Sequence, residues 1–312
     1  MGLPVTVYRY TDAGAPQLVN ATPSEWINIL KKVLVEGYGD KAPLGWTLEF
    51  ENAGAFKVAF RNSLANGGSG GYFQFWSTTG GDAAGTTCNI NAAIAMSSLD
   101  VFIKPIGLRT LKTSTQGKAW EIIGTSRGFY IIQHRSIAPM TMFTNTQDQQ
   151  ICHFIGDIQS FIANDMATFT IISANSVDGD NASTSYVVTN IASQSVIFSR
   201  LYASDNSVNY AYYKYNYIFP AVTTGVSSEA ETLGVQHILA PIILNISFNT
   251  TNNQSQTLPT VRGFAPGLYE SSFCGYRDTV WPVDVNINGV VFTLLRGYYT
   301  ARLWISTGEW YE

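Results

Sequence analysis

The sequence contains one match to the serine-hydrolase motif G-x-S-x-G. Residues 67–71 are GGSGG, with Ser69 in the position of the nucleophile. In a hydrolase this motif forms a sharp turn between a strand and a helix, and the turn exposes the serine hydroxyl. Here no helical pattern follows, and the tract consists only of glycine and serine. A polar loop is therefore the favoured interpretation.

Histidine is the usual general base for such a serine. The chain has three histidines, His134, His153 and His237, and each stands alone in apolar sequence. Nothing in the sequence pairs any of them with a carboxylate, and structural histidines are commoner than catalytic ones. We therefore predict no catalytic residue and no enzymatic activity.

Metal and phosphate sites are also poorly supported. Residues 178–181, DGDN, resemble part of a calcium loop but lack its alternating ligands and closing glutamate, so an acidic turn is favoured. The zinc and nucleotide motifs H-E-x-x-H, C-x-x-C, G-x-x-x-x-G-K-[ST] and G-x-G-x-x-G do not occur. Among the 22 acidic residues nothing singles out a glycosidase pair, and Glu229 and Glu231 suit a solvated loop or a helix start. We predict neither a metal nor a cofactor.

The three cysteines, Cys88, Cys152 and Cys274, are far apart in the sequence and odd in number. Such spacing supports neither a disulfide framework nor a structural zinc site. Reduced thiols in the core, made in a reducing cytosol, are the simpler interpretation.

Composition limits the class of protein. Hydrophobic residues make up 46% and aromatic residues 13% of the 312 positions, which indicates a folded chain. Charged residues are only 13%, against about 25% in typical soluble proteins. The net charge of −4 leaves no basic surface for nucleic acid. We also expect no signal peptide and no membrane span, because no long uncharged apolar stretch occurs.

One helix is predicted at about residues 23–36, packed on a sheet. Thr22 and Glu25 form a T-x-x-E capping box, and Pro23 suits the first helical position. Apolar residues then recur at three-to-four spacing up to Gly37, which is a natural C-terminal stop.

Most other apolar segments have the length and alternation of strands. The predicted strands are 46–50, 55–60, 72–76, 88–96, 120–123, 128–133, 166–172, 195–203, 242–248, 290–295 and 301–305. Two hairpin turns are predicted, at residues 51–54 and 124–127. The fold class is therefore mainly β, with an antiparallel sandwich-like or barrel-like body.

The predicted chain is a single β-rich unit over residues 1–312. Three polar stretches, 65–71, 175–184 and 250–257, suit loops, and none is long enough to mark a boundary. An alternative division has a helix-containing part, 1–172, and a C-terminal β part, 173–312.

A tyrosine-rich segment, NYAYYKYNYIF from Asn209, is the one candidate contact surface. On a strand, Tyr213, Tyr215 and Tyr217 share one face, and Tyr210 and Tyr212 share the other. A half-buried strand with its hydroxyls at the rim is the favoured interpretation. The alternative is a subunit interface or a ladder that stacks against sugars.

Three stretches together resemble a family of tailed-bacteriophage virion structural proteins. The first, residues 7–63, has the family's turn and packing positions at Ala15, Pro16, Leu18, Gly37, Gly39, Lys41, Gly45, Trp46, Phe56, Lys57, Phe60 and Arg61. The second joins AWEIIGTSRGFYIIQHR (119–135) to ICHFIGDIQSFIANDMATFTII (151–172), with departures at Thr125 and Ile155. The third comprises VRGFAPGLYESSF (261–273) and the closing ISTGEW (305–310).

This resemblance implies a non-enzymatic virion component that assembles in several copies with other virion proteins, most naturally in the tail or neck. A head-decoration protein and a tail-tip or fibre-like module that binds a host glycan are the alternatives. An enzyme, such as a depolymerase, and a secreted or outer-membrane β protein are further hypotheses. The implied location is the virion, after synthesis in the host cytoplasm. A low-charge β protein also suits repeated interfaces, because neighbouring copies can cover its edge strands.

Overall fold

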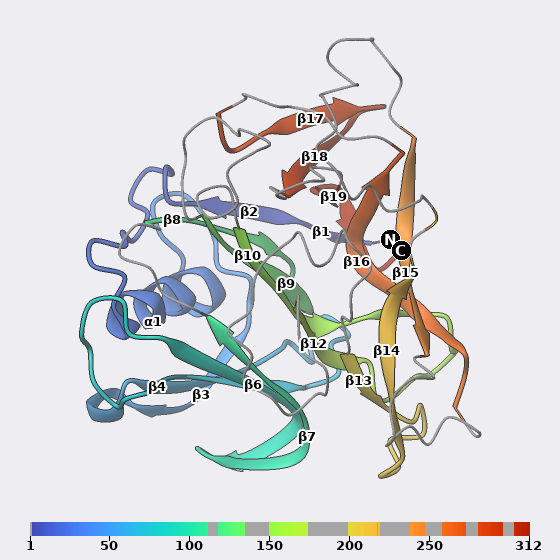
Figure 1. The fold of residues 1–312 in the computed structure, drawn as a ribbon, viewed down its shortest axis with the longest axis horizontal. Coiled ribbons are helices and arrows are strands. Elements are labelled where there is room, and N and C mark those ends of the chain that lie inside the picture. Colours follow the sequence, from blue (N-terminus) through green and yellow to red (C-terminus); the bar gives the residue numbers. More distant parts are fainter. Residues whose placement is uncertain are drawn as a thin grey trace, which may run out of the picture.

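The computed structural model describes residues 2–111, 118–134, 150–173, 199–216, 218, 238–246, 258–272, 280–295 and 303–312. Its described part is mainly antiparallel β-sheet with a single α-helix, which confirms the predicted fold class (Figure 1).

The helix forms as its capping residues dictate. Helix α1, Pro23–Lys31, begins with the predicted capping box, in which the Glu25 amide donates to Thr22 Oγ1 and the Thr22 amide donates to Glu25 Oε2. A wider π-helical turn, Lys32–Glu36, continues it to Gly37, whose φ of 82° ends the helix. The apolar face of α1 is buried against the sheets.

The first sheet lies under α1 and is called the helix-side sheet (Figure 1). Its five strands pair in sequence order: β3 (Thr47–Asn52), β4 (Lys57–Arg61), β5 (Tyr72–Ser77), β6 (Cys88–Ser98) and β7 (Val101–Leu111). A short 3₁₀ turn, Ala53–Ala55, joins β3 to β4 where the hairpin turn is predicted.

The second sheet is called the middle sheet. Its five strands pair in the order β12 (Phe169–Ser173), β10 (Gln150–Asp157), β9 (Gly128–His134), β8 (Ala119–Gly124) and β2 (Thr6–Arg9). The predicted hairpin at residues 124–127 joins β8 to β9.

The third sheet, called the C-terminal sheet, has eight strands. Its main path runs through β13 (Ser199–Tyr202), β14 (Tyr210–Asn216), β15 (Leu239–Ile246), β16 (Val261–Ser271), β19 (Leu303–Ser306), β18 (Val290–Leu295) and β17 (Asp284–Ile287). The short strand β11 (Gln159–Ser160) leaves the middle sheet and pairs with β16.

The two ends of the described chain meet at one place. Strand β1 (Leu3–Pro4) pairs with β20 (Glu309–Trp310), and Figure 1 shows the termini side by side next to β15 and β16. This pairing closes the body near the C-terminal sheet.

The core has two main parts, one on each face of the middle sheet. Alternate residues, such as Ile122 and Ile131, face α1 and the helix-side sheet. Their neighbours Ile123 and Ile132 face the C-terminal sheet. Strands β8 and β9 are buried throughout, as expected for the central layer of three. The division near residue 172 stays a prediction.

The spacing of apolar residues predicts neither β10 nor the two longer strands β7 and β16, and the latter two contain proline. Pro105 lies beside a register shift against β6. Pro266 lies where the pairing of β15 with β16 shifts at Pro241 and Ile243. Proline cannot donate to the ladder, so it is tolerated where a bulge already interrupts the hydrogen bonds. The bulges also break the alternation by which a strand is recognised.

Within the described residues, no helix combines the length and apolarity that crossing a membrane requires.

Gly267 should be intolerant of a side chain. It has φ +68°, and an added Cβ would lie 2.1 Å from Nε1 of the buried Trp310. Gly80 has φ +69° with no atom within 4 Å of the same position, so it is a matched control. We expect Gly80→Ala to cost about 1–2 kcal/mol, from the left-handed backbone alone. Gly267→Ala should cost a further 1–3 kcal/mol or so from overpacking, measured by urea unfolding. Equal losses in both variants would contradict the packing of Trp310.

Candidate functional site

Three buried carboxylates tie the layers together, and the first is Glu121 on β8. Its Oε1 lies 2.6 Å from Arg9 Nε and its Oε2 lies 2.6 Å from His134 Nε2. Burial alone would raise the pKa of Glu121, but His134 and Arg9 outweigh it and hold the pKa below its ordinary value. Arg9 also pairs with Asp284 at 2.7 Å, so this cluster joins the middle sheet to β17.

The second carboxylate, Asp157, ends strand β10 and is fully buried. It accepts hydrogen bonds from Ser69 Oγ at 2.5 Å, the Ser69 amide at 3.0 Å, Asn62 Nδ2 at 2.9 Å and Thr168 Oγ1 at 2.9 Å. Burial raises the pKa of Asp157, while the hydrogen bonds from Ser69 and the charge of Arg127 oppose that rise. The residue thereby fixes the loop between β4 and β5.

The G-x-S-x-G match therefore lies in a fixed loop between two antiparallel strands. Ser69 donates directly to a carboxylate, without an intervening imidazole. Neither described histidine is bonded to Ser69. His134 Nε2 is hydrogen-bonded to Glu121, and His153 Nε2 lies 3.2 Å from the Thr110 carbonyl oxygen. This arrangement differs from a nucleophile activated by histidine.

The third carboxylate is Asp165, which forms a two-pronged ion pair with Arg262 at 2.8 Å for both contacts. Ser160 Oγ also donates to Asp165, and Arg262 Nη2 donates to the Tyr202 carbonyl. Both charged side chains are buried, so each compensates the charge of the other inside the protein. It anchors the segment after β11 to β16.

His153 and the two described thiols are buried side chains. Burial and the nearby Arg109 lower the pKa of His153 to about 3, so it is neutral at physiological pH. Cys88 and Cys152 are free and buried, and burial raises the pKa of both thiols. Cys274 lies outside the described residues.

The tyrosine segment forms strand β14, and most of its rings are enclosed by the chain itself. Tyr213 and Tyr215 share one face and pack in the core against the middle sheet. On the other face, Arg200 Nη2 donates to the hydroxyl of buried Tyr212, and Tyr210 is half-buried. Tyr217 lies outside the described residues. This placement favours the packing interpretation, and the interface or glycan hypothesis at these tyrosines stays untested.

Several other candidates lie outside the described residues as well, namely His237, Glu229, Glu231 and the turn at 178–181. Over the ranges that the structure does describe, no three His, Cys, Asp or Glu side chains come together in a metal-binding arrangement.

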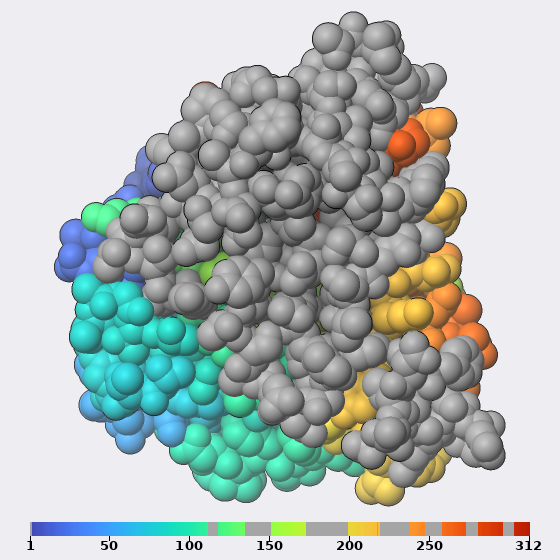
Figure 2. Space-filling view, viewed as in Figure 1, coloured from blue at the N-terminus to red at the C-terminus, as the bar shows by residue number. Residues whose placement is uncertain are grey.

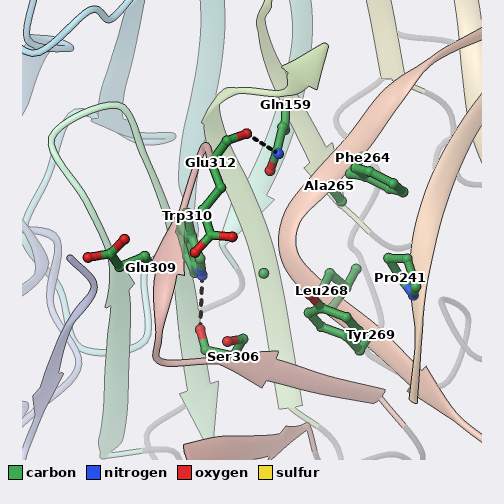
Figure 3. A pocket seen from close by; sticks show the side chains of 11 residues that line it. Gln159, Pro241, Phe264, Ala265, Leu268, Tyr269, Ser306, Glu309, Trp310 and Glu312 are labelled. Atoms are coloured by element: carbon green, nitrogen blue, oxygen red, sulfur yellow. Dashed lines mark hydrogen bonds between the residues drawn. The ribbon is translucent and has the colours of Figure 1, made fainter. Parts of the chain in front are cut away.

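Two adjoining hollows lie beside the last residues of the described chain, and together they are called the C-terminal groove. The first has a volume of about 150 Å³ and is lined by Phe264, Tyr269 and Trp310, among others (Figure 3). The second has a volume of about 300 Å³ and is mostly polar, with Arg127 in its wall. Gln159 and Glu312 line both hollows, and Gln159 Nε2 donates to the Glu312 carbonyl at 3.1 Å.

Sequence reasoning did not single out Arg127, Asp157 or Gln159. Asp157 ends a buried strand in FIGD, one of the stretches that carry the family resemblance, and a charged residue there was the available signal. Its partner Ser69 is 88 positions away, so the contact is invisible in sequence.

No protein-family model matches the chain, and no curated protein matches it significantly. The geometry of the chain itself must therefore support any proposal about its function.

We predict that Glu121→Gln destabilises the protein strongly. The change leaves Arg9 and His134 facing a neutral amide in the interior, at a cost of about 3–5 kcal/mol. Asp284→Asn is the control, because its side chain is 34% exposed against 1% for Glu121, and should cost about 1 kcal/mol or less. Urea unfolding at pH 7 measures both, and similar losses would contradict a buried Glu121 cluster.

His153 should make the fold sensitive to acid. Its pKa is about 3 in the folded chain against 6.5 when unfolded, so between these values only the unfolded state takes up the proton. The free energy of unfolding should therefore fall with pH below 6.5, by about 1.4 kcal/mol per pH unit from this group. His153→Gln should remove that part of the slope in urea unfolding between pH 6 and 4. An unchanged slope would show that His153 titrates normally.

Proposed function

We propose that this protein is a non-enzymatic structural component of a tailed-phage particle that assembles in several copies, with the tail or neck as its place. The resemblance of three sequence stretches to virion proteins supports the proposal, as do the low charge and the antiparallel β architecture. The proposed location is the virion, after synthesis in the host cytoplasm.

The observation that carries self-assembly is the β7 edge of the helix-side sheet, whose first half pairs with no further strand among the described residues. Strand β7 is the last strand of this sheet, and Val101 and Ile103 in its first half are each 48% exposed. Unpaired backbone groups beside exposed apolar side chains form a template for another strand. Lys104, with φ 53°, and Pro105 follow this stretch, so the charge and the proline that commonly limit an exposed edge lie beyond Val101 and Ile103.

The open part of β7 is short and rigid. At its start, Asp100 is fixed by Lys57 Nζ at 2.6 Å and by Gln74 Nε2 at 2.9 Å. Beyond it, the Pro105 carbonyl accepts from Arg200 and Tyr202, so β13 covers the second half of the strand. Figure 2 shows β7 in green meeting the yellow β13–β14 turn at the lower edge of the molecule.

A second copy of the chain is the natural occupant of this edge. Antiparallel pairing of two identical edges places residue i of one copy opposite residue j of the other, and j opposite i, so both strands are satisfied at once. The alternatives are a head-decoration protein, which assembles only on its particle, and a tail-tip or fibre-like module that binds a host glycan.

Self-assembly predicts a discrete oligomer that survives tenfold dilution from micromolar concentration in light scattering. Ile103→Lys should shift the protein to monomer, because a charge on the edge strand opposes strand pairing. Val280→Lys is the matched control, since Val280 is more exposed, at 57%, and lies four residues before β17, a strand at the opposite end of the molecule from β7 in Figure 1. A wild-type monomer at both concentrations, or equal dissociation of both variants, would contradict assembly through β7.

A further inference from the structure

The C-terminal groove contains a guanidinium that the surrounding chain holds in place. The Arg127 guanidinium lies 4.1 Å from the centre of the Tyr311 ring, and its Nε lies 3.6 Å from Asp157 Oδ2. These contacts fix the side chain, and its buried Nε is turned toward Asp157. Arg127 also lines the second hollow, and a planar guanidinium presents its donors in a fixed geometry that suits the hydroxyl groups of a ligand there.

The rest of the groove presents the chemistry that recognises hydroxyl groups. Gln159, Ser160 and Asn164 add amide and hydroxyl groups to the polar hollow. The adjoining hollow adds the aromatic rings of Phe264 and Tyr269, which Figure 3 shows across the space from Glu312. Polar groups placed around an aromatic wall are the usual composition of a small-ligand site.

Charge decides between a neutral and an anionic ligand. Among the described residues that line the two hollows, Arg127 carries the one positive charge, and its neighbour Asp157 lies behind it. Glu309 and Glu312 bring negative charge, while Asp165 is neutralised by Arg262. Repulsion from these carboxylates disfavours a phosphate or a carboxylate ligand.

The groove is built on rigid elements. Strand β11 pairs with β16 at Gln159 and Ser160, and an added Cβ on Gly263 would lie 2.2 Å from the Gln159 carbonyl. Tyr311 donates to the Asp157 carbonyl at 2.7 Å, which anchors the far wall. A preformed site needs little ordering when a ligand enters.

We propose that the C-terminal groove binds a neutral saccharide, with Arg127, Asn164 and Gln159 bonded to its hydroxyls and an aromatic wall against its apolar face. The two adjoining hollows suit two successive sugar units. This site is distinct from strand β14, and its occupation does not depend on self-assembly through β7.

Saturation-transfer NMR with the methyl glycosides of glucose, galactose, mannose and N-acetylglucosamine tests the proposal. At roughly 10 mM sugar a millimolar site is nearly filled, so transfer to ring protons of at least one neutral sugar is expected. Arg127→Lys keeps the positive charge but removes the planar, two-pronged donor geometry of the guanidinium, and should weaken sugar binding about tenfold.

Asn164→Gly is the second variant, because Asn164 has φ 57° and glycine adopts that conformation freely. It should weaken binding about fivefold by removing the amide from the groove. Asn288→Gly is the matched control, with φ 53° at the β17–β18 turn, and should bind as the wild type does. Near-UV circular dichroism verifies that each variant is folded.

No transfer to any neutral sugar, or transfer that is equal in all variants, would overturn the proposal. Stronger transfer to glucuronate than to the neutral sugars would overturn the choice of ligand, because it would show an anion site at Arg127. Light scattering on the same samples reports assembly separately, so failure of one proposal is distinguishable from failure of the other.

Discussion

Burial of both faces of the middle sheet is the constraint on which the rest of the structure depends. Strands β8 and β9 have no solvent face, so every polar side chain on them needs a partner inside the protein. Glu121 is the most demanding of these side chains because it is charged, and it is paired with both Arg9 and His134. Because Arg9 extends on to Asp284, the satisfaction of one buried charge also sets the position of the β17–β18 hairpin.

The same constraint explains the contacts at the end of β10. Asp157 is buried where the middle sheet, the loop after β4 and the last residues of the chain come together. A carboxylate in that position needs hydrogen-bond donors from each of these segments, because burying it unpaired would destabilise the fold by several kcal/mol. One consequence is that Arg127, which balances its charge, stands at the wall of a hollow.

The two proposals use different parts of this framework. Assembly would use the β7 edge of the helix-side sheet, where the covering strand β13 reaches only as far as Pro105. Saccharide binding would use the seam between the middle and C-terminal sheets, beside β11. A virion protein that pairs through one edge and presents a sugar site elsewhere would join the two functions that its sequence suggests separately.

The sequence by itself determined the local features. The capping box, the end of the helix at Gly37 and the hairpins after β3 and β8 follow from contacts between residues close in the chain. Alternation likewise indicates which residues of a strand share a face. These signals were sufficient for the fold class and for most of the strands.

Only the tertiary structure decided which faces are covered and which distant groups meet. Alternation placed Tyr213 and Tyr215 together, but the packing of the middle sheet against that face of β14 determined that they are buried. The bulges that accommodate Pro105 and Pro266 depend on neighbouring strands, so β7 and β16 could not be recognised alone. Ser69 with Asp157, and Arg127 with Tyr311, meet because sheets stack, and stacking is a long-range outcome that local periodicity does not encode.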